Sequence, residues 1–127
     1  MTHTPQNAVA WMEIPVSDID AGMAFYSKVF DYDMSKDESG PNPMAMLPIK
    51  DMTSGVSGHL YPGTPAKDGN GPTIHLYVPD SLEATAERCA AAGGTIKSDP
   101  ITIPPGRFQY VQDPDGNSLG LFEPGAS

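Results

Sequence analysis

The chain has 127 residues and a hydrophobic content of 39%, which suffices for one compact domain with a core of its own. Sixteen acidic residues against seven basic ones give a formal net charge of −9, and this disfavours nucleic acids and anionic membranes as partners. No stretch has the roughly 18 apolar residues of a membrane span, residues 1–7 lack a signal-peptide pattern, and the single cysteine, Cys89, excludes an intramolecular disulfide, so we expect a cytoplasmic protein.

The first predicted elements are a strand and a helix. Residues 11–16 alternate in polarity, as a strand with one buried face does. A helix is expected to begin near Ser17, with Asp20 three residues later in a capping box, and to continue to residue 30. The spacing of its apolar side chains is that of one helical face, formed by Ile19, Met23, Tyr26 and Phe30. Two short strands, at about 44–49 and 56–61, complete this half.

The same order of elements returns in the second half. Val16 and Asp18 correspond to Val78 and Asp80 at an offset of 62 residues. Asp80 is expected to cap a second helix that buries Leu82, Ala86 and Cys89 and ends at the glycines 93–94. Three strands follow at about 95–103, 107–112 and 117–122, and residues 113–116 form a turn between the last two.

The sequence therefore predicts an α+β fold of two tandem β-α-β-β-β modules within a single domain that spans 1–127. Module one covers about 7–62 and module two about 73–124. The stretch 63–72 is rich in Gly, Pro, Asp and Asn and is expected to be the linker.

Several of these segments together resemble the vicinal oxygen chelate superfamily of glyoxalases, bleomycin resistance proteins and dioxygenases. The resemblance is carried by 7–18, 24–26, 29–30, 91–94 and 113–117, and it extends over about 7–124. It is nearest to glyoxalase-like members of unassigned activity. It implies a curved, half-open mixed sheet with helices outside, a concave cleft that binds a small molecule, and a homodimer.

Metal-binding relatives hold a divalent cation with His, Gln or Glu side chains on the first and last strands of each module. Carried over to this chain, the first-strand positions are Trp11 and Thr73, and the last-strand positions are Gly120 and, 62 residues earlier, Gly58. These side chains do not form the nitrogen and oxygen shell that such a cation needs. We therefore expect no metal ligand and no cofactor, with a divalent metal on displaced ligands as an alternative.

Strand alternation predicts which side chains line the cleft. Glu13 and His75 occupy equivalent positions of the two modules, and they are candidate catalytic groups for proton transfer. His59 receives no role, because the offset aligns it with Leu121 on the helix side. The candidate ligand-binding residues are aromatic or aliphatic, namely Trp11, Tyr77, Leu60, Phe122 and Tyr110.

Three functions are compatible with this pattern. The first is a metal-independent lyase or isomerase that uses Glu13 and His75. The second is a non-catalytic protein that binds an antibiotic-like small molecule in the cleft. The third is a metal-dependent glyoxalase or dioxygenase with displaced ligands.

Overall fold

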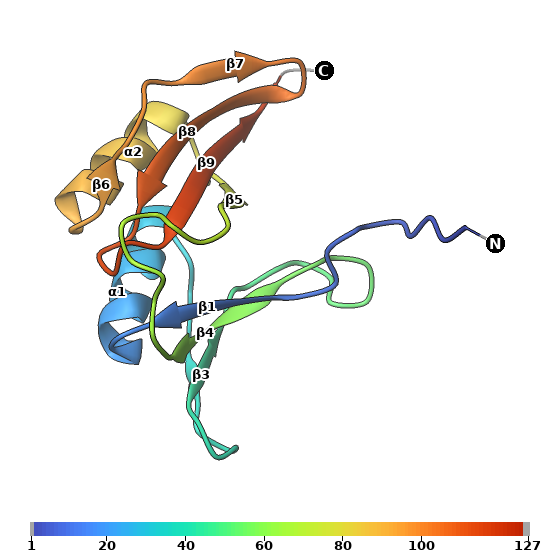
Figure 1. The fold of residues 1–127 in the computed structure, drawn as a ribbon, viewed down its shortest axis with the longest axis vertical. Helices are drawn as coiled ribbons and strands as arrows, with labels where there is room; N and C mark the ends of the chain where they lie inside the picture. The colour runs from blue at the N-terminus through green and yellow to red at the C-terminus, as the bar shows by residue number, and fades with distance from the viewer. Residues whose placement is uncertain (1, 126–127) are drawn as a thin grey trace.

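The protein consists of two mixed sheets, each with a helix packed on one face (Figure 1). The structure is a computed structural model and describes residues 2–125. Module one contains β1 (Met12–Val16), α1 (Ile19–Phe30), β2 (Lys36–Asp37), β3 (Met44–Met46) and β4 (Gly58–Pro62). Module two contains β5 (Ile74–Tyr77), α2 (Leu82–Ala91), β6 (Thr95–Ile96), β7 (Ile101–Ile103), β8 (Gly106–Gln112) and β9 (Ser118–Pro124).

The two modules share one topology. Sheet A has the strand order β1-β4-β3-β2, and sheet B has the order β5-β9-β8-β6 with β7 also paired to β8. In each sheet the first strand pairs in parallel with the last, and both first strands lie at a sheet edge. Neither sheet closes into a barrel, so the predicted α+β class with open mixed sheets is confirmed.

The core lies between each sheet and its helix. On β1 the side chains of Ile14 and Val16 are 1% exposed, and the residue between them, Pro15, is only half-buried. Leu76 is the corresponding core residue on β5. This period of two is the predicted pattern of a strand with one buried face.

Helix α1 begins one residue later than predicted. Asp18 is the N-cap, and its Oδ1 accepts hydrogen bonds from the backbone amides of Asp20 and Ala21 at 2.9 and 3.1 Å. Ser17 instead donates its hydroxyl to Asp115 of module two. The helix ends where Asp31 adopts a left-handed conformation, with φ of 58°.

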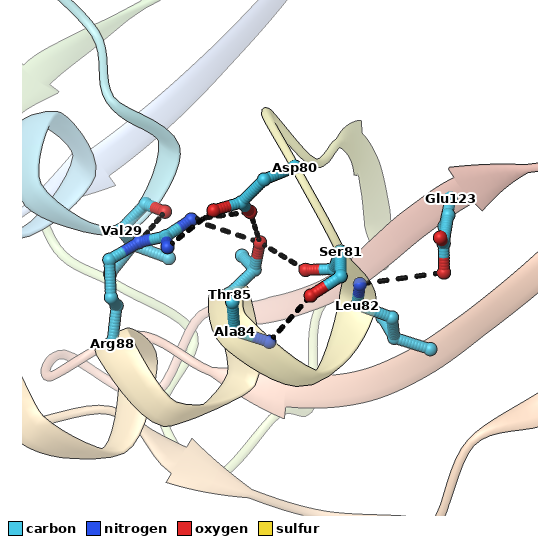
Figure 2. A network of polar contacts seen from close by, with 8 residues as sticks. All are labelled: Val29, Asp80, Ser81, Leu82, Ala84, Thr85, Arg88 and Glu123. Carbon is cyan, nitrogen blue, oxygen red and sulfur yellow. Dashed lines mark hydrogen bonds and ion pairs between the residues drawn. The ribbon is translucent and has the colours of Figure 1, made fainter.

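Helix α2 is capped by Ser81 and not by Asp80 as predicted (Figure 2). The hydroxyl of Ser81 accepts from the amide of Ala84 at 3.1 Å. Asp80 accepts two hydrogen bonds from the guanidinium of Arg88, at 2.8 and 2.9 Å, which lower the pKa of its carboxyl group. Arg88 also donates from Nε to the carbonyl of Val29 in α1, so it joins the two helices.

The strands differ from prediction mainly in their ends. The segment predicted as one strand over 95–103 forms two short strands that pair with different parts of β8. The predicted strand over 44–49 ends at residue 46, just before Leu47 and Pro48, and β2 was not predicted. The turn at residues 113–116 is confirmed by a 3.0 Å hydrogen bond from the amide of Gly116 to the carbonyl of Asp113.

Neither α1 nor α2, the helices of the described part of the chain, has the length and apolar character that crossing a membrane requires.

Candidate functional site

Each sheet packs one face on its helix and leaves the opposite face open (Figure 1). On β1 the open face carries Glu13, and on β5 it carries His75 and Tyr77. Residues that pair side by side in adjacent strands point to the same face. His59, which pairs with Glu13, and Gly120, which pairs with His75, therefore belong to these faces too. We call them open face A, on sheet A, and open face B, on sheet B.

Open face B carries a cluster of aromatic rings from three strands. The ring of His75 on β5 lies 5.1 Å from that of Phe108 and 6.0 Å from that of Tyr110, both on β8, between ring centroids. Tyr77 and Phe122 meet edge to face at 5.6 Å. A cavity of about 400 Å³ lies here, lined by His75, Tyr77, Ile103, Phe108 and Phe122. A concave, mostly apolar surface with a few polar tips is typical of small-molecule sites.

The position of His75 depends on a glycine. A β-carbon on Gly120 would lie 2.2 Å from Nδ1 of His75, far inside van der Waals contact. The imidazole thus occupies the space above Gly120, one of the four positions from which relatives are expected to supply a metal ligand.

Open face A has a different chemistry. The indole Nε1–H of Trp11 donates a 2.9 Å hydrogen bond to Nδ1 of His59. Nε2 of the same imidazole lies 3.2 Å from Oε1 of Glu13. A cavity of about 220 Å³ opens beside this group, lined by Glu13, Gly40, Pro41, Asn42, Met44, His59 and Tyr61.

The pairing of β4 corrects the predicted roles of Leu60 and His59. Ile14 pairs with Leu60, and its counterpart Leu76 pairs with Leu121, so the offset between the modules falls from 62 on the first strands to 61 on the last. Leu60 is therefore 0% exposed in the core and lines none of the cavities described, so its prediction as a ligand-binding residue was wrong. His59, not Gly58, is the counterpart of Gly120.

The structure does not bring Glu13 and His75 together. Glu13 lies beside His59 on sheet A, whereas His75 lies among the rings of sheet B. No hydrogen bond or ion pair within residues 2–125 joins them. Glu13 lines the cavity on face A and His75 lines the cavity on face B, and neither residue lines both. Of the other predicted residues, Tyr77 and Phe122 line the face B cavity, Tyr110 packs on its rings, and Trp11 lies on face A.

A third cavity, of about 590 Å³, lies between the modules. Residues of the N-terminal segment, of the loop before β4 and of β5 line it, and most of these side chains are apolar. His75 and Tyr77 line this cavity as well as the face B cavity, so strand β5 separates the two cavities and contributes to both.

Two titratable groups lie in the core, away from these faces. Burial, with a smaller contribution from Asp113, raises the pKa of Cys89 to about 11, and this thiol is 0% exposed. Burial and the neighbouring carboxylate of Asp113 also raise the pKa of Tyr26. Cys89 is thus an unreactive core residue, as its place on the predicted helix face indicated.

A family model described as the Glyoxalase/Bleomycin resistance protein/Dioxygenase superfamily matches residues 8–121. The chain belongs to this superfamily. A protein of Mycobacterium bovis named "Putative glyoxylase CFP32" is 31% identical over 116 residues, which are 90% of this chain and 43% of that protein. The chain thus spans less than half the length of this relative.

Solved structures of superfamily members have the same fold. A glyoxalase/bleomycin resistance protein from Albidiferax ferrireducens matches with a TM-score of 0.71 at 18% identity, over 94% of this chain and 100% of that one. TnmS3, described as an antibiotic binding protein from a Streptomyces species, matches with a TM-score of 0.64 at 25% identity, over 97% and 100%.

The superfamily's divalent metal does not fit the residues at its expected positions. With the corrected pairing these are Trp11, His59, Thr73 and Gly120. The indole nitrogen of Trp11 carries a hydrogen and is no metal ligand, and Nδ1 of His59 already accepts the hydrogen bond from it. Thr73 is hydrogen-bonded to Ser118, and Gly120 has no side chain. Among residues 2–125 there is no group of three or more His, Cys, Asp or Glu side chains that could hold a metal.

Proposed function

We propose that this member of the superfamily binds a small, neutral, largely aromatic molecule on open face B. The exposure of its aromatic side chains carries the proposal. Tyr77 is 70% exposed and Tyr110 is 38% exposed, and they lie together with Phe108 and Phe122 in one aromatic cluster. A contiguous exposed apolar patch, unlike a single exposed residue, marks an interaction surface. No Asp, Glu, Lys or Arg lines the cavity among the described residues, so shape and ring contacts would select the ligand.

His75 is the polar group that would orient such a ligand. Its imidazole stands on edge against Phe108, with an interplanar angle of 79°, so ring stacking alone does not use its hydrogen-bonding capacity. A hydroxyl or carbonyl group on the ligand would fit a hydrogen bond to it. The structural similarity to TnmS3, an antibiotic binding protein, supports a binding role.

Calorimetric titration with 2-naphthol, and with 2-naphthoate as a charged counterpart, tests this proposal. We expect 2-naphthol to bind with one site per chain and 2-naphthoate to bind more weakly. Phe108→Ala should lower the affinity about tenfold or more, which corresponds to about 1.4 kcal/mol. Tyr61→Ala, on open face A, is the matched control and should leave it unchanged. Equal affinities for wild type and Phe108→Ala would overturn the proposal.

We also propose that the protein acts as a homodimer. The apolar side chains that stay exposed lie on both modules, including Trp11, Val56, Ile101 and Tyr110, and β1 and β5 are free sheet edges. The predicted lyase or isomerase chemistry of Glu13 and His75 would need such a second copy, with face A of one protomer against face B of its partner. Sedimentation equilibrium at micromolar concentration tests the dimer, and a monomer there would contradict it.

A further inference from the structure

We infer that open face A holds a second binding site, for a small organic cation of the alkylammonium or amidinium class. The inference does not depend on the ligand proposed for open face B, because the two cavities share no lining residue. It follows from the hydrogen bond that Trp11 donates to His59, from the carboxylate of Glu13 beside the same imidazole, and from the walls of the cavity.

The hydrogen bond from Trp11 fixes which nitrogen of His59 is the acceptor. An indole nitrogen can only donate a hydrogen bond, so Nδ1 of His59 must be the acceptor and carries no proton. The single proton of the neutral ring is then on Nε2, on the side of Glu13. A second proton, on Nδ1, would set two N–H donors against each other at 2.9 Å and break the bond to Trp11.

In this arrangement the carboxylate of Glu13, whose side chain is 64% exposed, has the N–H of an imidazole beside it and not a Lys or Arg side chain. Its ion-pair contact within residues 2–125 is the 3.2 Å approach of His59, which contributes a dipole but no charge. Within the described part of the chain, no Lys or Arg lines the cavity, and the titratable groups that face His59 are Glu13 from β1 and Tyr61 from β4. Met46, opposite His59 on β3, is apolar. A cation can thus enter next to a carboxylate without displacing another cation.

The walls of the cavity suit the apolar part of such a ligand. Tyr61 offers an aromatic ring, Met44 a polarisable thioether and Pro41 an aliphatic ring. Aromatic faces attract ammonium groups, and a thioether adapts to irregular alkyl groups. A volume of about 220 Å³ holds about seven non-hydrogen atoms at the roughly 30 Å³ that one water occupies in the liquid. This limits the class to small amines and amidines.

Butylammonium and butyrate, which are similar in size and opposite in charge, test the inference. Trp11 is the single tryptophan of the chain, so its indole N–H resonance reports directly on the group at His59. Butylammonium should shift this resonance saturably, and butyrate should not. Glu13→Gln should weaken butylammonium binding at least tenfold, whereas Glu38→Gln, an exposed carboxylate outside the cavity lining, should leave it unchanged. Saturation by both ions, or unchanged affinity in Glu13→Gln, would overturn the inference.

His59→Gln tests the role of the hydrogen bond from Trp11 separately. The side-chain oxygen of Gln can accept from the indole as Nδ1 of His59 does, so the affinity for butylammonium should persist. Loss of binding in His59→Gln would contradict the inference. Phe108→Ala should not change butylammonium binding. A failure of the proposed 2-naphthol site on face B can therefore be distinguished from a failure of the proposed cation site on face A.

Discussion

The hydroxyl of Tyr26 on α1 donates a 2.7 Å hydrogen bond to Oδ2 of Asp113, which lies 87 residues later in the turn before β9. The carboxylate of Asp113 is 3% exposed and also accepts from the side chain of Asn117 and from two backbone amides of its turn. The side-chain amide of Asn117 in turn donates to the carbonyl of Pro15 on β1. The tip of the β8–β9 hairpin is thereby attached to module one.

Loss of this hydrogen bond should destabilise the whole chain. Tyr26→Phe leaves a buried carboxylate with one donor fewer, at a cost of about 1–3 kcal/mol in the free energy of unfolding. Urea denaturation measures it. Tyr32→Phe is the matched control, because the hydroxyl of Tyr32 makes no hydrogen bond to the described residues, and it should change stability far less. Equal effects of the two substitutions would contradict the role of Tyr26.

The corrected pairing of β4 separates core from site. Leu60→Ala should lower the free energy of unfolding by about 2–5 kcal/mol, because it opens a cavity in the core. At a temperature where it remains folded, its affinity for 2-naphthol should equal that of the wild type. Phe122→Ala should do the opposite, with weaker binding and a smaller loss of stability. A Leu60→Ala protein that is fully stable yet fails to bind would restore the original prediction.

Gly120 should control the placement of His75. In Gly120→Ala the new β-carbon would overlap the imidazole, so the ring must move out of its contact with Phe108. We expect changed His75 ring resonances and about tenfold weaker binding of 2-naphthol. Gly40→Ala is a suitable control, because a β-carbon there meets no other atom within 4 Å. Unchanged His75 resonances would show that the ring does not need the glycine.

The protein should lose stability at alkaline pH. Burial raises the pKa of Cys89 from 9.0 to about 11 and that of Tyr32 from 10.0 to about 12, and it raises that of Tyr26 as well. The unfolded chain therefore loses these protons first, and the free energy of unfolding falls as the pH rises above about 9. Denaturation between pH 8 and pH 11 measures the slope, at most about 1.4 kcal/mol per pH unit for each group.

The cysteine variant provides the comparison for this slope. Cys89→Ala should have lower stability at pH 8 but a shallower decline between pH 9 and pH 10, where the thiol of the unfolded chain titrates first. Parallel curves for the two proteins would rule out a contribution from Cys89.

Periodicity within single segments was sufficient to predict much of the fold. The spacing of Ile19, Tyr26 and Phe30 predicted α1, and the alternation around Ile14 and Val16 predicted the buried face of β1. Both signals depend only on the repeat of the local backbone, 3.6 residues per turn in a helix and two in a strand, so they can be read without knowledge of distant contacts. The similarity between the modules followed from the same local patterns.

The composition of the site was decided by tertiary structure. Ile14 and Leu60 pair across 46 residues, whereas Leu76 and Leu121 pair across 45, and the sequence between the strands does not reveal this difference. In a strand a shift of one residue moves every side chain to the opposite face. That shift places Leu60 in the core and brings His59 onto open face A, between Trp11 and Glu13. Sequence alone determined that Glu13 and His75 face outward from the core, and the pairing of distant strands decided which neighbours each of them has.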